Sequence, residues 1–451
     1  MKTASIRQAA GSAALARQEG IPPWPTPQDR DFASLIDYHL YGEVLQIASA
    51  EAFVTAETLS SPEEGLRNRT KKLFLIRKPT PTNVSGLLSI LARFSWLRPH
   101  ERDRHRFAIT VEGRTAASLY QGDELGFRRL LARRLNDRYV VPGWFVHRLY
   151  SLNPPGQGEV VLPAPRRSFT GERRQWADSC WNVQLDSEVI EAAREVNRLL
   201  PGSFPANEDR WLELVRAAWQ RLGRRAKTGP KSDRQTTFGV RGRLSHAMRE
   251  AAVTFLFGAR PPGGRGPDFV PAEDPVHARS FDVWCPRLSE LEIIFYTDYH
   301  PLVPGKIIVP CGAFRQPPAP REFEQVDGIR DPLGDVLFLF QPSWSAIREN
   351  FLGVLLEAYR TESKRVGAFY VSLLAVRDEV CRRLRLSAEL FDRMIAIAYE
   401  EAIRDTSADR RLISISLESD IRPDQRTAVG LNQRPVYIKK VPQSLIAIQN
   451  N

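Results

Sequence analysis

Two stretches at opposite ends of this 451-residue chain repeat the same order of apolar patterns. In each stretch, apolar residues recur at helical spacing in three successive runs and then alternate in the short runs typical of strands. The N-terminal runs cover 31–48, 61–77, 82–94 and 106–110. The C-terminal runs cover 347–365, 371–384, 387–398, 412–417, 436–438 and 445–448. This order predicts an α+β, multidomain fold with a small module of helices and strands at each end.

Four segments follow from the pattern. We expect a flexible, proline-rich N-terminal segment (1–30), a first module (31–121), a mixed α/β middle region (122–346) and a second module (347–451). In the middle region the patterns predict a proline- and glycine-rich connector at 151–175, helices at 188–200, 208–222 and 244–257, and strands at 291–296, 306–309 and 336–340.

The first module is expected to end in a β-hairpin with a charged tip. Residues 98–105 read RPHERDRH and lead into the strand 106–110, after which Glu112 and Gly113 open another helix. Thr82 is expected to cap the helix that precedes the hairpin, because a threonine side chain can accept the unpaired N–H groups of the first turn. That helix would bury Val84, Leu87, Leu88, Leu91 and Phe94.

The hairpin strand carries a short motif. Phe107, Ile109, Thr110, Gly113 and Arg114 match the order aromatic-x-Leu/Ile-Thr-x-x-Gly-Arg, so residues 31–121 resemble the winged-helix DNA-binding domain, and the C-terminal stretch shares the layout. The resemblance implies that helix 82–94 is the recognition element for a major groove. Asn83, Ser85, Ser89 and Arg93 would form its exposed polar face. Winged-helix modules also bind other proteins, so protein docking remains an alternative to DNA contact.

Charge points to an acidic partner. Lysine and arginine number 64 against 53 acidic residues, which gives a net charge of +11. The segment 221–243 holds eight basic residues and one acidic residue among four glycines, and we expect a flexible loop that follows a phosphate backbone, or else a merely solvated loop. The candidate nucleic-acid contacts are Arg93, Arg102, Arg104, Arg106, Arg221, Arg224, Arg225, Lys227, Lys231, Arg234, Arg241, Arg243, Arg382 and Arg383.

Signatures of common enzymes are missing from the sequence. It contains no GxxxxGK[ST], HExxH or GxSxG pattern, and Lys364 is the one lysine that follows an acidic residue, Glu362, by two positions. The one cluster of reactive types is His277, Asp282, Cys285, Glu292, Asp298, His300 and Cys311. Its spacings match no zinc motif, so we expect buried polar residues rather than a metal or carboxylate site, and no cofactor. Cys381 is expected to be a core thiol.

The leading hypothesis is a non-catalytic protein that binds nucleic acid, expected to be double-stranded DNA, through phosphate contacts. The first alternative is a protein-docking scaffold subunit of a bacterial nucleoprotein or phage-defence complex. The second is an enzyme with a site in 268–311. No apolar run is long enough to cross a membrane, the N-terminus lacks a secretory pattern, and the four cysteines form no CxxC pair, so a cytoplasmic location is expected.

Overall fold

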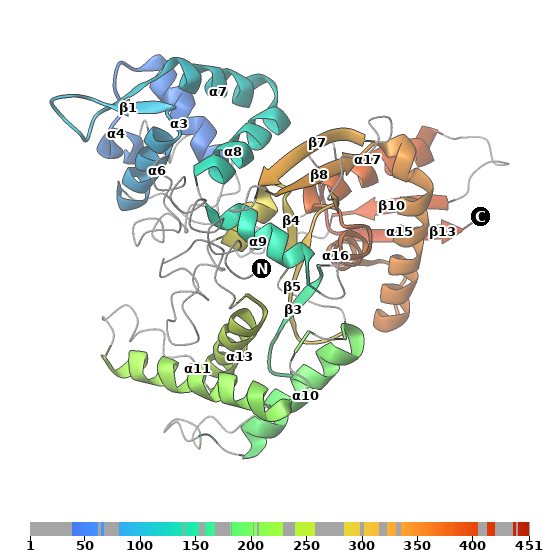
Figure 1. The fold of residues 1–451 in the computed structure, drawn as a ribbon. Coiled ribbons are helices and arrows are strands. Elements are labelled where there is room, and N and C mark those ends of the chain that lie inside the picture. The colour runs from blue at the N-terminus through green and yellow to red at the C-terminus, as the bar shows by residue number, and fades with distance from the viewer. Residues whose placement is uncertain are drawn as a thin grey trace.

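The computed structural model has a mixed α+β fold (Figure 1). It describes residues 38–61, 65–66, 81–138, 140–152, 158–166, 181, 183–201, 203–204, 207–228, 240–257, 284–297, 302–314, 323–330, 335–404, 413–419, 436–438 and 441–450. The segment 1–30 and most of the helix predicted at 61–77 lie outside these residues, and the division into domains stays a prediction.

The first module consists of helices followed by a hairpin. Its elements are α3 (Tyr38–Ala50), α4 (Ala56–Ser60), α6 (Pro81–Arg93), β1 (Leu97–Pro99), β2 (Phe107–Ile109) and α7 (Val111–Gly122). The strands β1 and β2 pair antiparallel, with Leu97 opposite Ile109. Val54, between α3 and α4, adds an antiparallel bridge to Phe107 through hydrogen bonds of 2.9 and 3.0 Å.

Two local predictions for this module need correction. The prediction that Thr82 caps α6 is wrong, because the helix already begins at Pro81, whose missing N–H costs nothing in a first turn. The five-residue helix α4 was not predicted. Thr55 caps it, and the side chains of Thr55 and Thr58 each accept from the other residue's backbone N–H, so two orphan donors are satisfied within one turn.

The middle region contains two antiparallel sheets with helices around them. Its helices are α8 (Glu124–Arg138), α9 (Val140–Tyr150), α10 (Val183–Leu199), α11 (Glu208–Thr228) and α13 (Val240–Phe257). Its strands are β3 (Val160–Pro163), β4 (Ile294–Thr297), β5 (Gly305–Pro310), β6 (Ala313–Phe314), β7 (Phe323–Arg330) and β8 (Val336–Pro342). The strand orders are β3-β5-β4 and β6-β8-β7. Three predicted helices and three predicted strands are confirmed with shifted ends, whereas α8, α9, β6 and β7 were missed.

The predicted connector at 151–175 is wrong at its centre. Residues 160–163 form the buried strand β3, which pairs with β5 in register Val160 opposite Ile308. The run EVVLP is short and lies between prolines and glycines, which favour a connector. Its strand partner β5 lies almost 150 positions later in the chain, so the local sequence does not show the pairing.

The second module repeats the order of the first. Its elements are α15 (Trp344–Val366), β9 (Val371–Ser372), α16 (Leu373–Leu384), α17 (Ala388–Arg404), β10 (Ile413–Glu418), β11 (Val436–Ile438), β12 (Val441–Gln443) and β13 (Leu445–Asn450). The sheet order is β10-β13-β9. In both modules, the extended residues after the first helix pair with the last strand of the main sheet: Val54 with β2, and β9 with β13.

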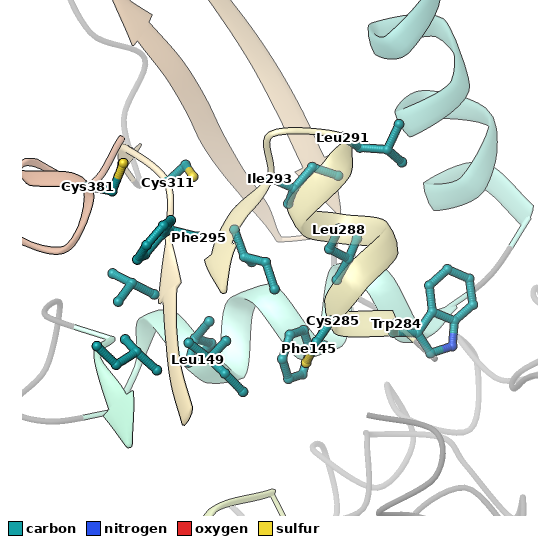
Figure 2. Packing of buried hydrophobic residues seen from close by; sticks show 14 of the residues in the cluster. Phe145, Leu149, Trp284, Cys285, Leu288, Leu291, Ile293, Phe295, Cys311 and Cys381 are labelled. Atoms are coloured by element: carbon teal, nitrogen blue, oxygen red, sulfur yellow. The ribbon is translucent and has the colours of Figure 1, made fainter. Parts of the chain in front are cut away.

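A continuous apolar core connects these elements. Figure 2 shows side chains of α9, of the helical residues 284–290 and of β4 packed together, with Phe145, Cys285, Leu288 and Phe295 among them. Within the part of the chain that the structure describes, no helix combines the length and apolarity needed to cross a bilayer.

Candidate nucleic-acid interface

Thr110 and Gly113 fix the hairpin of the first module against α7. The Thr110 hydroxyl caps α7 by accepting from the Gly113 N–H at 3.0 Å, and it donates to the Ser95 carbonyl at 2.6 Å. A Cβ at Gly113 would lie 2.1 Å from the Trp96 carbonyl oxygen, so only glycine allows this approach. The threonine and glycine of the motif therefore set the direction in which the hairpin leaves the module.

The hairpin tip, residues 98–106, projects from the molecule and is strongly basic (Figure 1). Arg98, Arg102, Arg104 and Arg106 are exposed, and Arg106 pairs with Asp103 at 3.4 Å. The turn is ordered by backbone hydrogen bonds, including His100 N–H to the Arg106 carbonyl at 2.8 Å. The His100 ring also meets the edge of Phe53, with 5.0 Å between ring centroids. These contacts fix the conformation of the turn, on which four arginine side chains are exposed.

Helix α6 presents a polar but uncharged surface beside the hairpin. The predicted apolar face is confirmed, because Val84, Leu87, Leu88, Leu91 and Phe94 are buried. Thr82, Ser85 and Ser89 are exposed, and the Ser89 hydroxyl donates to the Ser85 carbonyl of its own helix at 3.0 Å. Arg93 is half-buried in the last turn and has an interaction within the chain. The Asn83 side chain lies outside the described residues.

The predicted basic loop at 221–243 is wrong at both ends. Helix α11 continues to Thr228 and α13 begins at Val240, so Arg224, Arg225, Lys227 and Arg241 belong to helix ends. Lys231 and Arg234 lie outside the described residues. The glycines suggested a loop, yet Gly223 sits within α11, where a Cβ would lie 2.1 Å from Nη2 of Arg243. The missing side chain makes room for that guanidinium.

Arg221 and Arg243 make contacts between α11 and α13. Arg243 stacks on the Trp219 ring at 4.1 Å and donates to the Trp219 carbonyl at 2.7 Å. Burial lowers the pKa of Arg243 from its ordinary value. Arg221 is 14% exposed and lies 3.7 Å from the Glu250 carboxylate. Both side chains contact the partner helix and join α11 to α13, and a contact with nucleic acid stays a prediction for them.

Arg382 and Arg383 of α16 also bond within the chain. Arg382 pairs with Glu379 at 2.8 Å and with Glu159 at 3.4 Å. Arg383 pairs with Glu357 of α15 at 2.7 Å. Both arginines therefore take part in ion pairs within the chain, and their contact with nucleic acid stays a prediction.

The reactive cluster in 268–311 is only partly described. His277, Asp282, Asp298 and His300 lie outside the described residues. Cys285 and Cys311 are buried core residues, and burial raises the pKa of Cys311 well above its ordinary value. The described residues include no group of three His, Cys, Asp or Glu side chains that could hold a metal ion. The core position predicted for Cys381 is confirmed, since it is 0% exposed.

Sequence reasoning missed a buried polar cluster that is centred on Glu292. Its carboxylate is 4% exposed and accepts hydrogen bonds from Arg128 at 2.7 Å, Gln341 at 2.5 Å, Ser387 at 3.0 Å and Arg393 at 3.2 Å. The backbone there has φ of 62°, a left-handed conformation that is uncommon for a residue with a side chain. The four donors thus come from α8, β8, the residue before α17 and α17 itself.

Arg128 extends the cluster to the first module. Its Nη2 donates to the Tyr38 hydroxyl at 2.7 Å and to Glu124 at 2.8 Å, and the guanidinium lies 4.4 Å from the Tyr38 ring centroid. Burial raises the pKa of Tyr38 far above its ordinary value, so the hydroxyl stays protonated. The Tyr38 hydroxyl in turn bonds to Glu124. We call Tyr38, Glu124, Arg128, Glu292, Gln341, Ser387 and Arg393 the polar hub.

One face of α8 also lines a cavity of about 60 Å³, the α8 cavity. Its lining from α8 is Leu125, Arg128, Arg129, Ala132, Arg133 and Asn136. The opposite walls come from residues 291–293, Cys311, β7 and β8. The other five α8 residues follow Leu125 by 3, 4, 7, 8 and 11 positions, which is the spacing of one helix face, and this periodicity could have been found in the sequence.

No family model, curated protein or solved structure matches this chain.

Proposed function

We propose that the protein binds double-stranded DNA through the first module, with the hairpin tip as the main contact and α6 beside it. The observation that carries the proposal is the exposure of Arg98, Arg102, Arg104 and Arg106 on one projecting, ordered turn. Arginine forks match phosphate oxygens in two parallel hydrogen bonds, and phosphate contacts supply most of the affinity for a duplex. The resemblance to the winged-helix domain supports the same surface.

The proposed contact positions the protein on the duplex more than it reads sequence. Among the described side chains of α6, the exposed polar ones are Thr82, Ser85 and Ser89, and their short hydroxyls do not make the bidentate contacts to base edges that arginine makes. Arginines at the tip can reach the backbone without base recognition. Affinity should therefore depend strongly on salt and weakly on sequence.

The second module is assigned a different part in this proposal. Helix α17, which corresponds in order to α6, holds four acidic and two basic residues, and these acids would repel phosphates. Its neighbour α16 already uses Arg382 and Arg383 in ion pairs. A single DNA-contacting module at the N-terminal end is thus the assignment that the charges favour.

The test is a salt titration of duplex binding with a triple variant, Arg102→Gln, Arg104→Gln and Arg106→Gln. Each phosphate contact contributes about 0.9 to the slope of log K against log salt, so losing all three should flatten the slope by up to about 2.7. Affinity should fall by a similar factor on unrelated duplexes. The matched control removes two equally exposed arginines of the middle region, Arg194→Gln and Arg210→Gln, which are 64% and 62% exposed. Unchanged binding in the triple variant, or equal loss in the control, refutes the assignment.

One observation favours the second candidate, a docking scaffold. Val366 and Phe369 are 51% and 49% exposed around the left-handed Gly367 that ends α15. Neighbouring apolar side chains at such exposure mark a surface suited to a protein partner. If the purified chain shows no duplex binding at low salt, where electrostatic contacts are strongest, this candidate replaces the first.

A further inference from the structure

The hairpin of the first module has two faces of opposite character. Successive side chains of a strand point to opposite faces of a sheet, and directly opposite residues of two strands share a face. Leu97 pairs with Ile109 in the hairpin, and Val54 pairs with Phe107 beside it. All four side chains are buried or pack against the apolar core. They form the inner face, so the alternate residues of the same strands form the outer one.

The outer face combines an aromatic ring with arginines. Arg98 lies opposite Ala108 in the hairpin, and the neighbouring antiparallel bridge places Phe53 beside Ala108 on its other side. His100 and Arg106 lie two positions further along the two hairpin strands, where the His100 N–H donates to the Arg106 carbonyl at 2.8 Å. We call Phe53, Arg98, His100, Arg106 and Ala108 the outer hairpin face.

Phe53 is held on this face and stays accessible, since it is 41% exposed. Hydrogen bonds of 2.9 and 3.0 Å between Val54 and Phe107 fix the backbone next to it. The small side chain of Ala108 leaves room for the Phe53 ring to reach His100, with 5.0 Å between centroids and an interplanar angle of 87°. A T-shaped pair covers a face of one ring at most, so an aromatic ring face remains available to a ligand.

The ring lies among cations that suit a phosphate backbone. Arg98 is exposed, and Arg106 is 58% exposed with an ion pair to Asp103 at 3.4 Å. Exposed pairs of this kind contribute little to stability, so a phosphate can replace the carboxylate at little cost. Residues 98–106 hold four arginines against two carboxylates, which leaves this turn a net positive charge.

We propose that the outer hairpin face binds an unpaired nucleotide next to a duplex, with the base stacked on Phe53 and the phosphates on Arg98 and Arg106. Stacking on a side chain needs a base whose flat face is accessible, which the stack of bases inside a duplex prevents. Aromatic rings interleaved with cations hold single strands without reading their sequence. The inference rests on the proposed duplex binding by the hairpin tip and adds that the bound DNA carries a single-stranded overhang.

The experiment measures fluorescence anisotropy of the full chain with three labelled probes: a blunt duplex, the same duplex with a short oligothymidylate overhang, and single-stranded oligothymidylate. The test variants are Phe53→Leu, which keeps an apolar side chain without a ring, and Phe53→Tyr, which keeps the ring. The matched control is Phe369→Leu in the second module, since Phe369 is 49% exposed and forms a T-shaped pair with Tyr370 at 5.5 Å.

The wild-type chain, Phe53→Tyr and Phe369→Leu should bind the overhang duplex at least about fivefold more tightly than the blunt duplex, which corresponds to about 1 kcal/mol of stacking. Phe53→Leu should lose this preference, although it keeps every charge that the additional phosphates of the overhang could meet. Its Kd for the blunt duplex should be unchanged, which also shows that the variant is folded.

Equal affinity of the wild-type chain for the two duplexes overturns the inference while the proposed duplex binding stands. The same holds if the preference survives in Phe53→Leu, if it disappears equally in Phe369→Leu, or if Phe53→Leu weakens both duplexes by the same factor. Phe53-dependent binding of the single strand without duplex binding supports the stacking role and refutes the proposed function. A chain that binds none of the probes refutes both.

Discussion

Individual arginines of this chain differ in what they do, although their sequence contexts are alike. Arg243 and Arg102 both sit among other basic residues, yet Arg243 stacks on Trp219 whereas Arg102 is exposed at the hairpin tip. The difference is set by a residue distant in sequence, since Gly223 provides the space that Arg243 fills. Local charge density predicted the basic character of both places and could not predict which guanidinium groups pack internally.

Gly113 allows a prediction about a single methyl group. We expect Gly113→Ala to lower the free energy of unfolding by about 1–3 kcal/mol, because its Cβ would lie 2.1 Å from the Trp96 carbonyl oxygen. Gly353→Ala in α15 is the control, since a Cβ there meets nothing within 4 Å, and it should be stabilising by about 0.5–1 kcal/mol. Urea unfolding measures both. Equal effects of the two substitutions would show that the close approach at Gly113 is not rigid.

At the level of elements, hydrophobic periodicity predicted the helices whose apolar residues form one continuous face. It did not predict helices that have charged residues on the buried side. Helix α6 was predicted almost to its ends because its buried apolar residues recur at helical spacing and its exposed residues lie between them. Helix α8 was missed because Arg128 and Arg129 lie on its inward side, so charged residues interrupt the apolar face that marks a surface helix. Strand β3 was hidden because its pairing with β5 joins residues far apart in sequence.

Helix α13 gives a prediction about pH. His246 accepts a hydrogen bond from Arg249 at 3.0 Å, and burial, followed by the charges of Arg249 and Lys306, lowers the pKa of His246 to about 4 from 6.5. Between these values the unfolded chain binds a proton that the folded chain does not. The His246 contribution to stability is therefore complete above pH 6.5 and is lost as the pH falls toward 4.

The loss over this window should amount to about 1–3 kcal/mol in the free energy of unfolding. His246→Gln, which keeps an acceptor but cannot titrate, should show a smaller decrease between pH 7 and pH 4 when both proteins are unfolded by urea. Other groups titrate in both proteins and cancel in the difference. Parallel pH profiles for the two proteins would contradict a lowered pKa at His246.

On the scale of the whole molecule, the polar hub connects segments that the sequence presented as separate domains. Tyr38 lies in the first module, Arg128 in α8, Glu292 after the helical residues 284–290, and Arg393 in the second module. The proline- and glycine-rich stretches suggested modules that are linked by loops. The polar hub could not be predicted, because single residues in distant segments leave no periodic pattern in the sequence. Both ends of the chain should therefore unfold together with the middle region.

Glu292→Gln tests this coupling. The substitution removes the carboxylate that pairs with both Arg128 and Arg393. Breaking a buried ion pair from one side costs at most about 3–5 kcal/mol, and less is expected here because Arg128 keeps its pair with Glu124 at 2.8 Å and Arg393 is 38% exposed. We expect the wild-type chain to unfold in urea with one midpoint by tryptophan fluorescence and far-UV circular dichroism, and the variant to show two separated midpoints as the modules lose their common contact. Glu349→Gln, an exposed carboxylate of α15, should leave the single midpoint in place. A variant that keeps coincident transitions would mean that the apolar core, rather than the hub, couples the modules.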